Sequence, residues 1–469
     1  MELNPVGLDT SQPVNHLKFF TSAPELPGSW ADWAKRLAHS PAVHESGAIF
    51  RLAEDLAKAS AISTEAATAL LLWLGSVCMI QHTQIEWQSG IWQPGGLTMS
   101  IVEDDGVPID SIVNAFISLA RDIGIDPIND TVKEGPAGLI ARLESAGHVD
   151  RRANGAALRV DSLSDLGSLD TEDIETKHSS NRGNARALIY PSGRALLSYL
   201  YDTSFFNTLD ELIQHGNLNL RGKASTHKLT HVHMSTLVSF YQGALVTMTS
   251  DTRVQNNMTA LLRQMLIFWP TSGVKRFKRA GRIDIALHRI QKLAQTGFDA
   301  LGDLSEGVLR IPDMPAVASK TMLDADGVGV RYTILNREQR IAKLAVAVAF
   351  WRIAEGGNFE ITNGDLAIAD SILHMHEMGG RLFELTMAKG KMGHEFMRLF
   401  VRLLDGEVLE TGEEIAQASE LNIGVAAIGR LKDMSVVSPE GKLEDEYRFI
   451  KGSTMALHRK RWNIEEPAK

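Results

Sequence analysis

Residues 96–121, GLTMSIVEDDGVPIDSIVNAFISLAR, decide the fold that we expect for this chain. Residues 97–102 form a short apolar run, which predicts a buried β-strand. Residues 103–108 contain Gly106 and Pro108, and they predict a turn. Apolar side chains then recur at helical spacing from Ile112, with Asp110 as a suitable N-cap. The stretch therefore predicts a strand, a tight turn and an amphipathic helix.

The same three parts build a phosphate-binding loop, in which backbone N–H groups and a helix N-terminus hold the ligand. A working loop of this kind has a lysine directly before its Ser or Thr, but here Ser111 follows Asp110. Glu103, Asp104 and Asp105 add three further carboxylates. Carboxylates repel phosphate instead of neutralising it. We therefore expect no ordinary ATP hydrolysis and no cofactor, although ATP with magnesium stays a possible ligand.

Composition describes a globular protein of two or three domains, with 469 residues of which 44% are hydrophobic. The one cysteine, Cys78, lies in the apolar run 66–80 and predicts a small buried core residue in a reducing compartment. That run is too short to span a bilayer, so we expect a core helix. The chain opens without an apolar signal segment. We expect a cytoplasmic protein that does not bind membranes.

Charge is spread unevenly along the chain, whose net charge is −9. Residues 201–300 carry twelve Lys or Arg against six Asp or Glu. The densest part interleaves basic residues with one aromatic residue, which suits a phosphate backbone with a stacked base. A solvated loop that contacts the protein's own acidic surface is the alternative. The candidate nucleic-acid contacts are Lys275, Arg276, Phe277, Lys278, Arg279 and Arg282.

Several other segments support a parallel α/β core, because strand and helix patterns alternate along the chain. Residues 156–163 predict a second buried strand containing Asp161, and residues 165–187 predict a polar surface loop. Residues 231–240 and part of 261–270 predict two more strands. We expect an N-terminal arm with helices over 1–60, the α/β core over 61–290 and a helical lid over 291–390.

The last region, 391–469, has its own pattern of three helices followed by a hairpin, which is typical of a winged helix-turn-helix. Its candidate recognition helix offers only Arg430 and Lys432 for DNA. A winged helix that contacts protein fits these residues equally well.

In this order of segments the chain resembles the RecA/AAA-type helicase-like domains found with primases in phage, plasmid and genomic-island replication proteins. The resemblance spans roughly residues 47–450. It implies a P-loop-like parallel sheet, a lid and a winged helix. It also implies partners in a replication or defence complex and a possible homo-oligomer.

The resemblance assigns roles to three residues of this sequence. Ser111 corresponds to the family's magnesium-binding hydroxyl, Asp161 to the Walker B aspartate, and Arg263 to an arginine that reaches a neighbouring subunit. The catalytic glutamate of the family corresponds to Ser162, so the group that orients water is missing. The resemblance thus implies a degenerate core that binds without hydrolysing. The alternatives are a DNA-dependent ATPase that completes its site between subunits, and a protein scaffold.

A metal site is not expected. His227, His231 and His233 include two residues that share one strand face, but no nearby cysteine or carboxylate completes a ligand set. A polar stripe on a half-exposed strand explains them without a metal.

Overall fold

The computed structural model describes residues 37–41, 43–87, 91–93, 96–129, 142–143, 185–191, 193, 216, 218–221, 226–229, 232–248, 265–270, 282–302, 308–312, 337–373 and 375–376. Within these residues the protein is mixed α/β with parallel strands, as the sequence predicts. Asp161, Arg263 and the winged-helix region 391–469 lie outside the described residues. The domain boundaries therefore stay a prediction.

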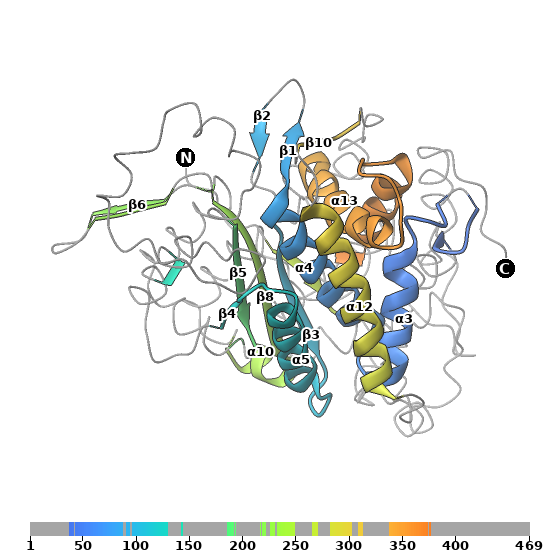
Figure 1. Ribbon diagram of the computed structural model, residues 1–469. Coiled ribbons are helices and arrows are strands. Elements are labelled where there is room, and N and C mark those ends of the chain that lie inside the picture. The colour runs from blue at the N-terminus through green and yellow to red at the C-terminus, as the bar shows by residue number, and fades with distance from the viewer. Residues whose placement is uncertain are drawn as a thin grey trace, which may run out of the picture.

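The centre of the molecule is a parallel five-stranded sheet. Its strands are β3 (Thr98–Glu103), β4 (Ile128–Asn129), β5 (Ala185–Tyr190), β8 (His233–Tyr241) and β9 (Leu266–Phe268). Their order is β4-β5-β8-β3-β9, so the first of the five strands lies between the fourth and the fifth (Figure 1). All four strand pairs are parallel. The carboxyl ends of the five strands consequently meet at one edge.

A layer of helices packs on this sheet. Helix α4 (Thr64–His82) contacts four of the strands, and α3 (Ala48–Ser60), α12 (Ile283–Gly302) and α13 (Arg337–Ala354) surround it (Figure 1). α4 is apolar on all sides, which is typical of a helix buried in a core. Gly75 allows the close approach of α13, because a Cβ there would lie 2.8 Å from the Ala347 carbonyl oxygen. Trp351 of α13 donates its indole N–H to the Leu71 carbonyl at 3.1 Å.

Helix α4 has the length and the apolar composition to cross a membrane, yet 89% of its apolar window is buried inside the protein. It is the only such helix among the described residues. Cys78 is fully buried on it. The predictions of a core helix over 66–80 and of a buried Cys78 are confirmed.

Two smaller sheets stand apart from the main one. β1 (Gln84–Trp87), β2 (Ile91–Gln93) and β10 (Val308–Arg310) form a three-stranded sheet, in which β10 pairs parallel with β1. β6 (Leu218–Arg221) and β7 (Thr226–Leu229) form an antiparallel hairpin between β5 and β8 in the chain.

The predicted loop over 165–187 is wrong at its end, because β5 begins at Ala185 and pairs with β8 along its whole length. Alanine and arginine are weak strand formers, so the sequence conceals this strand. Arg186 is nevertheless buried, and its guanidinium donates to the backbone carbonyls of Leu143 and Ala185 at 2.5 and 2.9 Å. Packing and strand pairing outweigh local preference here.

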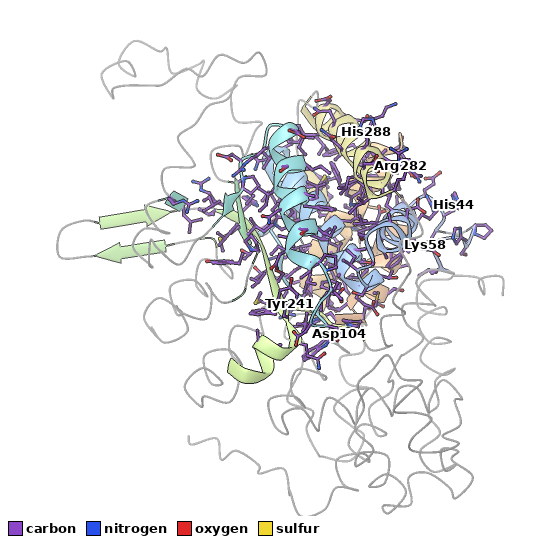
Figure 2. All side chains as sticks on the ribbon, turned by 90° about the horizontal axis from the view of Figure 1, so that it is seen from below. His44, Lys58, Asp104, Tyr241, Arg282 and His288 are labelled. Carbon is purple, nitrogen blue, oxygen red and sulfur yellow. The ribbon has the colours of Figure 1, made fainter. Side chains whose placement is uncertain are left out.

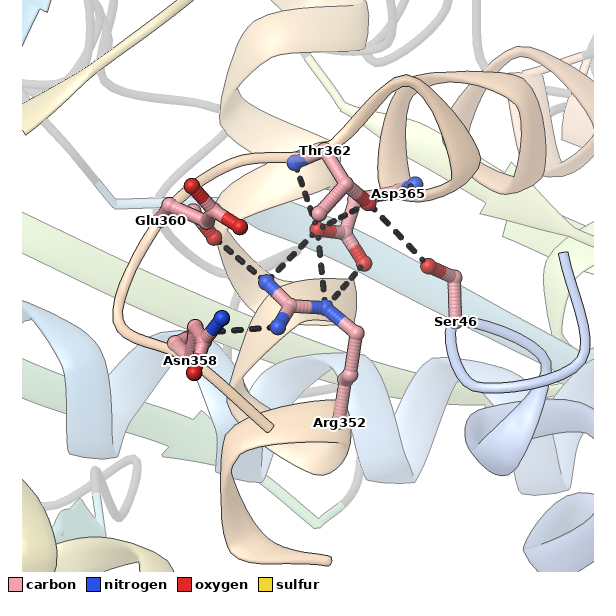
Figure 3. Close-up of polar contacts among 6 residues, drawn as sticks. All are labelled: Ser46, Arg352, Asn358, Glu360, Thr362 and Asp365. Atoms are coloured by element: carbon pink, nitrogen blue, oxygen red, sulfur yellow. Dashed lines mark hydrogen bonds and ion pairs between the residues drawn. The ribbon is translucent and has the colours of Figure 1, made fainter. Parts of the chain in front are cut away.

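A buried ion pair fixes the turn after α13 (Figure 3). Arg352 donates to the Asp365 carboxylate at 3.0–3.2 Å, and the two side chains are 3% and 0% exposed. The same guanidinium donates to the carbonyls of Asn358 and Glu360. Asp365 also accepts from the N–H and the hydroxyl of Thr362, both at 2.9 Å, while Thr362 Oγ1 accepts from the Asp365 N–H. This is a capping box at the start of the next helix.

Candidate functional site at the carboxyl edge of the sheet

The carboxyl edge of the parallel sheet is the candidate functional site, because ligands of open α/β sheets bind outside these strand ends. β3 ends at Glu103 and β8 ends at Tyr241, which face each other in the strand register. Helix α5 (Ile109–Asp122) starts from the same edge after a short turn. Figure 2 shows Asp104 and Tyr241 at this edge.

Glu103 belongs to the strand and not to the predicted acidic turn. Its side chain is fully buried. Oε1 accepts hydrogen bonds from the N–H and the hydroxyl of Ser63, at 2.8 and 2.5 Å. Ser63 is the N-cap of α4, and its hydroxyl oxygen accepts from the Ala66 N–H at 3.0 Å. The Glu103 carboxyl therefore lies at the N-terminus of the central helix, where a negative charge is favourable.

Burial raises the pKa of Glu103 to about 7, although the two hydrogen bonds from Ser63 lower it. The nearby carboxylates of Glu65 and Asp104 raise it further. Oε2 of Glu103 is buried without a hydrogen-bond partner in the described part of the chain. Desolvation thus outweighs the helix N-terminus at this carboxyl group.

The turn after β3 is closed by one of its own carboxylates. Asp105 Oδ1 accepts a hydrogen bond from the backbone N–H of Gly243 at 3.2 Å, at the start of the short helix α10 (Gln242–Met248). A Cβ on Gly243 would lie 2.3 Å from Asp105 Oδ2, so a larger residue there would displace this carboxylate. Gly106 has φ +93°, a conformation that favours glycine. One backbone N–H beside the turn, that of Gly243, is therefore already occupied by a carboxylate.

Helix α5 starts two residues earlier than predicted, and Asp110 is not its N-cap. The helix begins at Ile109 with Pro108 at the N-cap position, because proline fixes a suitable φ there. Asp110 lies in the first turn, where its carboxyl group interacts with the side chain of Tyr241. Desolvation raises the pKa of Asp110 and also that of Tyr241. Ser111 is exposed on the same turn.

β5 brings no carboxylate to this edge, because it ends at Tyr190 and is followed by Pro191. The N–H of Gly193 donates to the Ser239 carbonyl at 2.7 Å, and the Ser239 hydroxyl donates to the Pro191 carbonyl. The segment after β5 is consequently hydrogen-bonded to Ser239, near the end of β8.

Arg282 is the one candidate nucleic-acid residue among the described residues. Its side chain is 75% exposed just before α12, and it forms an ion pair with Asp284 at 2.9 Å (Figure 2). The other candidates lie outside the described residues: Lys275, Arg276, Phe277, Lys278, Arg279, Arg430 and Lys432. Their role stays a prediction.

Two of the three histidines of the sequence pattern lie in different strands, and His231 lies outside the described residues. The predicted half-exposed strand is wrong for β8, which is buried along nearly its whole length. His227 lies in the hairpin strand β7, while His233 begins β8 and is buried. No group of three or more His, Cys, Asp or Glu in the described part of the chain could hold a metal ion. Burial raises the pKa of the Cys78 thiol, which disfavours a reactive thiolate.

Sequence reasoning missed the partners of the acidic residues. Ser63 is recognisable as a helix start, but its contact with Glu103 joins residues 40 positions apart. The contact of Asp105 with Gly243 joins residues 138 positions apart. A glycine directly after a predicted strand, as in residues 241–243, is the signal that could have pointed to a close approach.

Comparison with known proteins assigns no relative to this chain. No protein-family model matches it, and no curated protein is significantly similar to it.

Proposed function

We propose that this chain is a degenerate RecA/AAA-like protein that binds nucleic acid, or a replication or defence complex of a phage or mobile element, without hydrolysing ATP. The parallel five-stranded sheet supports the fold part of this proposal, because the resemblance implies a parallel sheet core. This is an analogy of fold, and function is argued from the site.

The observation that carries the proposal is the chemistry of the turn after β3. A phosphate bound at this edge would need free backbone N–H donors and a cation nearby. Asp105 already accepts from the Gly243 N–H, and Asp110 stands in the position of the lysine. Each carboxylate adds repulsion toward a nucleotide phosphate at the same place. The turn thus carries an internal anion instead of accepting an external one.

A second reason comes from the sequence. Hydrolysis of a bound nucleotide needs a residue that orients the attacking water. The resemblance places Ser162 where its family has the glutamate with that role. A core of this kind would serve as a scaffold for binding.

Binding to nucleic acid rests on the basic segment 275–282 and, in the winged-helix region, on Arg430 and Lys432. Homo-oligomer formation and protein partners belong to the same proposal. The second candidate is an ATPase whose site is completed by a neighbouring subunit, with Ser111 and Asp161 on magnesium and Arg263 acting across the interface. The exposed position of Ser111 on the first turn of α5 favours it.

The test is a calorimetric titration of the whole protein with ATP and magnesium, followed by single-stranded DNA at several salt concentrations. We expect no heat from ATP and salt-sensitive DNA binding. Joint substitution of Lys275, Arg276, Lys278, Arg279 and Arg282 by alanine should flatten the salt dependence by about three units of slope. Saturable ATP binding would favour the ATPase. If neither ATP nor single-stranded DNA binds, the remaining candidate is a protein scaffold.

A further inference from the structure

The hairpin β6–β7 projects away from the main sheet among the described elements. Figures 1 and 2 show it extending from the sheet and helix layers in two perpendicular views. Among the described elements, β6 and β7 pack extensively only against each other. A two-stranded hairpin without a partner is at best marginally stable in water. A projecting arm of this kind is well placed to contact another molecule.

The strand register divides the hairpin residues between two faces. Arg221 pairs with Thr226, and Asn219 pairs with Lys228. Because residues two apart in a strand share a face, these four residues share one face of the hairpin. The other face carries the remaining four residues: Leu218, Leu220, His227 and Leu229. The hairpin is therefore amphipathic, with one polar face that contains two cations and no anion.

The surrounding sequence keeps this arm free of negative charge. Between Glu211 and Asp251 there is no Asp or Glu, although acidic residues outnumber basic ones in the whole chain by 57 to 48. Arg221 and Lys228 are diagonal neighbours on their face. The backbones of diagonal neighbours in an antiparallel pair lie about 7–8 Å apart. Such spacing lets two cations contact neighbouring phosphates of one nucleic-acid strand. Asn219 and Thr226 add neutral donors of the kind that contact phosphate and sugar oxygens.

We propose that the polar face of β6–β7, formed by Asn219, Arg221, Thr226 and Lys228, binds the phosphate backbone of a nucleic acid. The inference rests on the proposed function and assigns part of the binding to this hairpin. It adds a surface separate in sequence from the basic segment 275–282.

The experiment compares the full-length protein with the double variant Arg221→Gln/Lys228→Gln. Binding of fluorescent single-stranded DNA is measured by anisotropy across a range of salt concentrations. Loss of two phosphate contacts should flatten the slope of log K against log salt by about 1.4 and weaken binding at low salt roughly tenfold. The matched control is Lys58→Gln/Arg121→Gln, which removes two exposed cations from α3 and α5. The control should keep the slope of the wild type.

Each outcome separates this inference from the proposed function. A wild type that does not bind DNA even at low salt overturns the proposed function, and with it the hairpin's role. A wild type that binds DNA, with an unchanged slope in the hairpin variant, overturns the hairpin alone. An equal loss in the control variant also overturns it. If the hairpin variant loses only its binding to poly-glutamate and not to DNA, the face belongs to an acidic protein partner. Equal thermal unfolding of the three proteins verifies that the fold is kept.

Discussion

At the scale of the residue, Glu103 shows how burial changes the chemistry of a carboxyl group. Its two hydrogen bonds from Ser63 favour the charged form, and its removal from water favours the neutral form. The pKa of about 7 means that desolvation is the larger effect. Near neutral pH this core therefore holds a carboxyl group that is partly protonated.

This pKa predicts a specific dependence of stability on pH. The folded pKa of Glu103 is raised above its ordinary value of 4.5. Its favourable contribution is therefore fully present below about pH 4.5 and is lost as the pH rises to about 7. The loss amounts to about 3 kcal/mol, since each unit of pKa corresponds to about 1.4 kcal/mol. Glu103→Gln cannot titrate, so its free energy of unfolding should lack this decrease.

Urea unfolding of wild type and Glu103→Gln, from about pH 5 to about pH 8, measures the effect. The difference between the two free energies of unfolding should shift in favour of the variant as the pH rises. Asp55→Asn is the control, because Asp55 is an exposed carboxylate on α3. A difference that stays constant over this range would contradict the prediction.

The sequence predicted which charges this site would lack, but not where its carboxylates would lie. The absence of a lysine before Ser111 is a local fact and can be seen directly. The fates of Glu103 and Asp105 depend on Ser63 and Gly243, which are distant in sequence and adjacent only in the fold. Periodicity says nothing about such contacts.

At the scale of the element, the helix that follows α13 begins with a capping box whose acidic member also holds a buried arginine. Asp365→Ala should lower the free energy of unfolding by about 3–5 kcal/mol, because Arg352 would stay buried without its counter-ion. Thr362→Ala removes the cap and the hydroxyl's hydrogen bond to Asp365 but keeps the ion pair, so it should cost about 1 kcal/mol. Chemical denaturation measures both values.

The double variant Arg352→Met/Asp365→Leu distinguishes charge from packing. An apolar pair of similar volume should recover much of the loss, because no unpaired charge remains. If the double variant is as unstable as Asp365→Ala, the carbonyls of Asn358 and Glu360 depend on the guanidinium, and the ion-pair explanation is insufficient.

Elements with a clear period were predicted from the sequence, and elements made by pairing were not. The strand at 97–102 and the helix after it are confirmed within one or two residues. Strands β5 and β10 were not predicted from the sequence. Ala185 and Arg186 are not typical strand residues, and β10 has only three residues. Their structure comes from their neighbours β8 and β1.

At the scale of the whole molecule, α4 joins the sheet to the outer helices. Nearly all of its side chains are buried between β3 and β8 on one side and α3, α12 and α13 on the other. The core therefore draws on segments from both the beginning and the later part of the described chain. Opening any one layer exposes α4 to water.

Native-state hydrogen exchange should show this arrangement directly. The amides of α4, β3 and β8 should exchange most slowly, because they open only when the whole core unfolds. The hairpin β6–β7 should exchange many times faster, since among the described elements its two strands pack mainly on each other. Mass spectrometry of peptic fragments measures both. Comparable rates in α4 and in the hairpin would contradict the picture of one shared core.

The position of β3 between β8 and β9 has a consequence for synthesis on the ribosome. β3 ends at Glu103, whereas its second neighbour begins at Leu266, about 160 residues later. At roughly 5–20 residues per second, this delay lasts roughly 8–30 seconds. Until β8 has been made both edges of this apolar strand lack their final partners, and the edge that pairs with β9 lacks its partner for the whole delay, so it is open to pairing with other chains. Translation speed and chaperone access should therefore govern the yield of folded protein more than its equilibrium stability does.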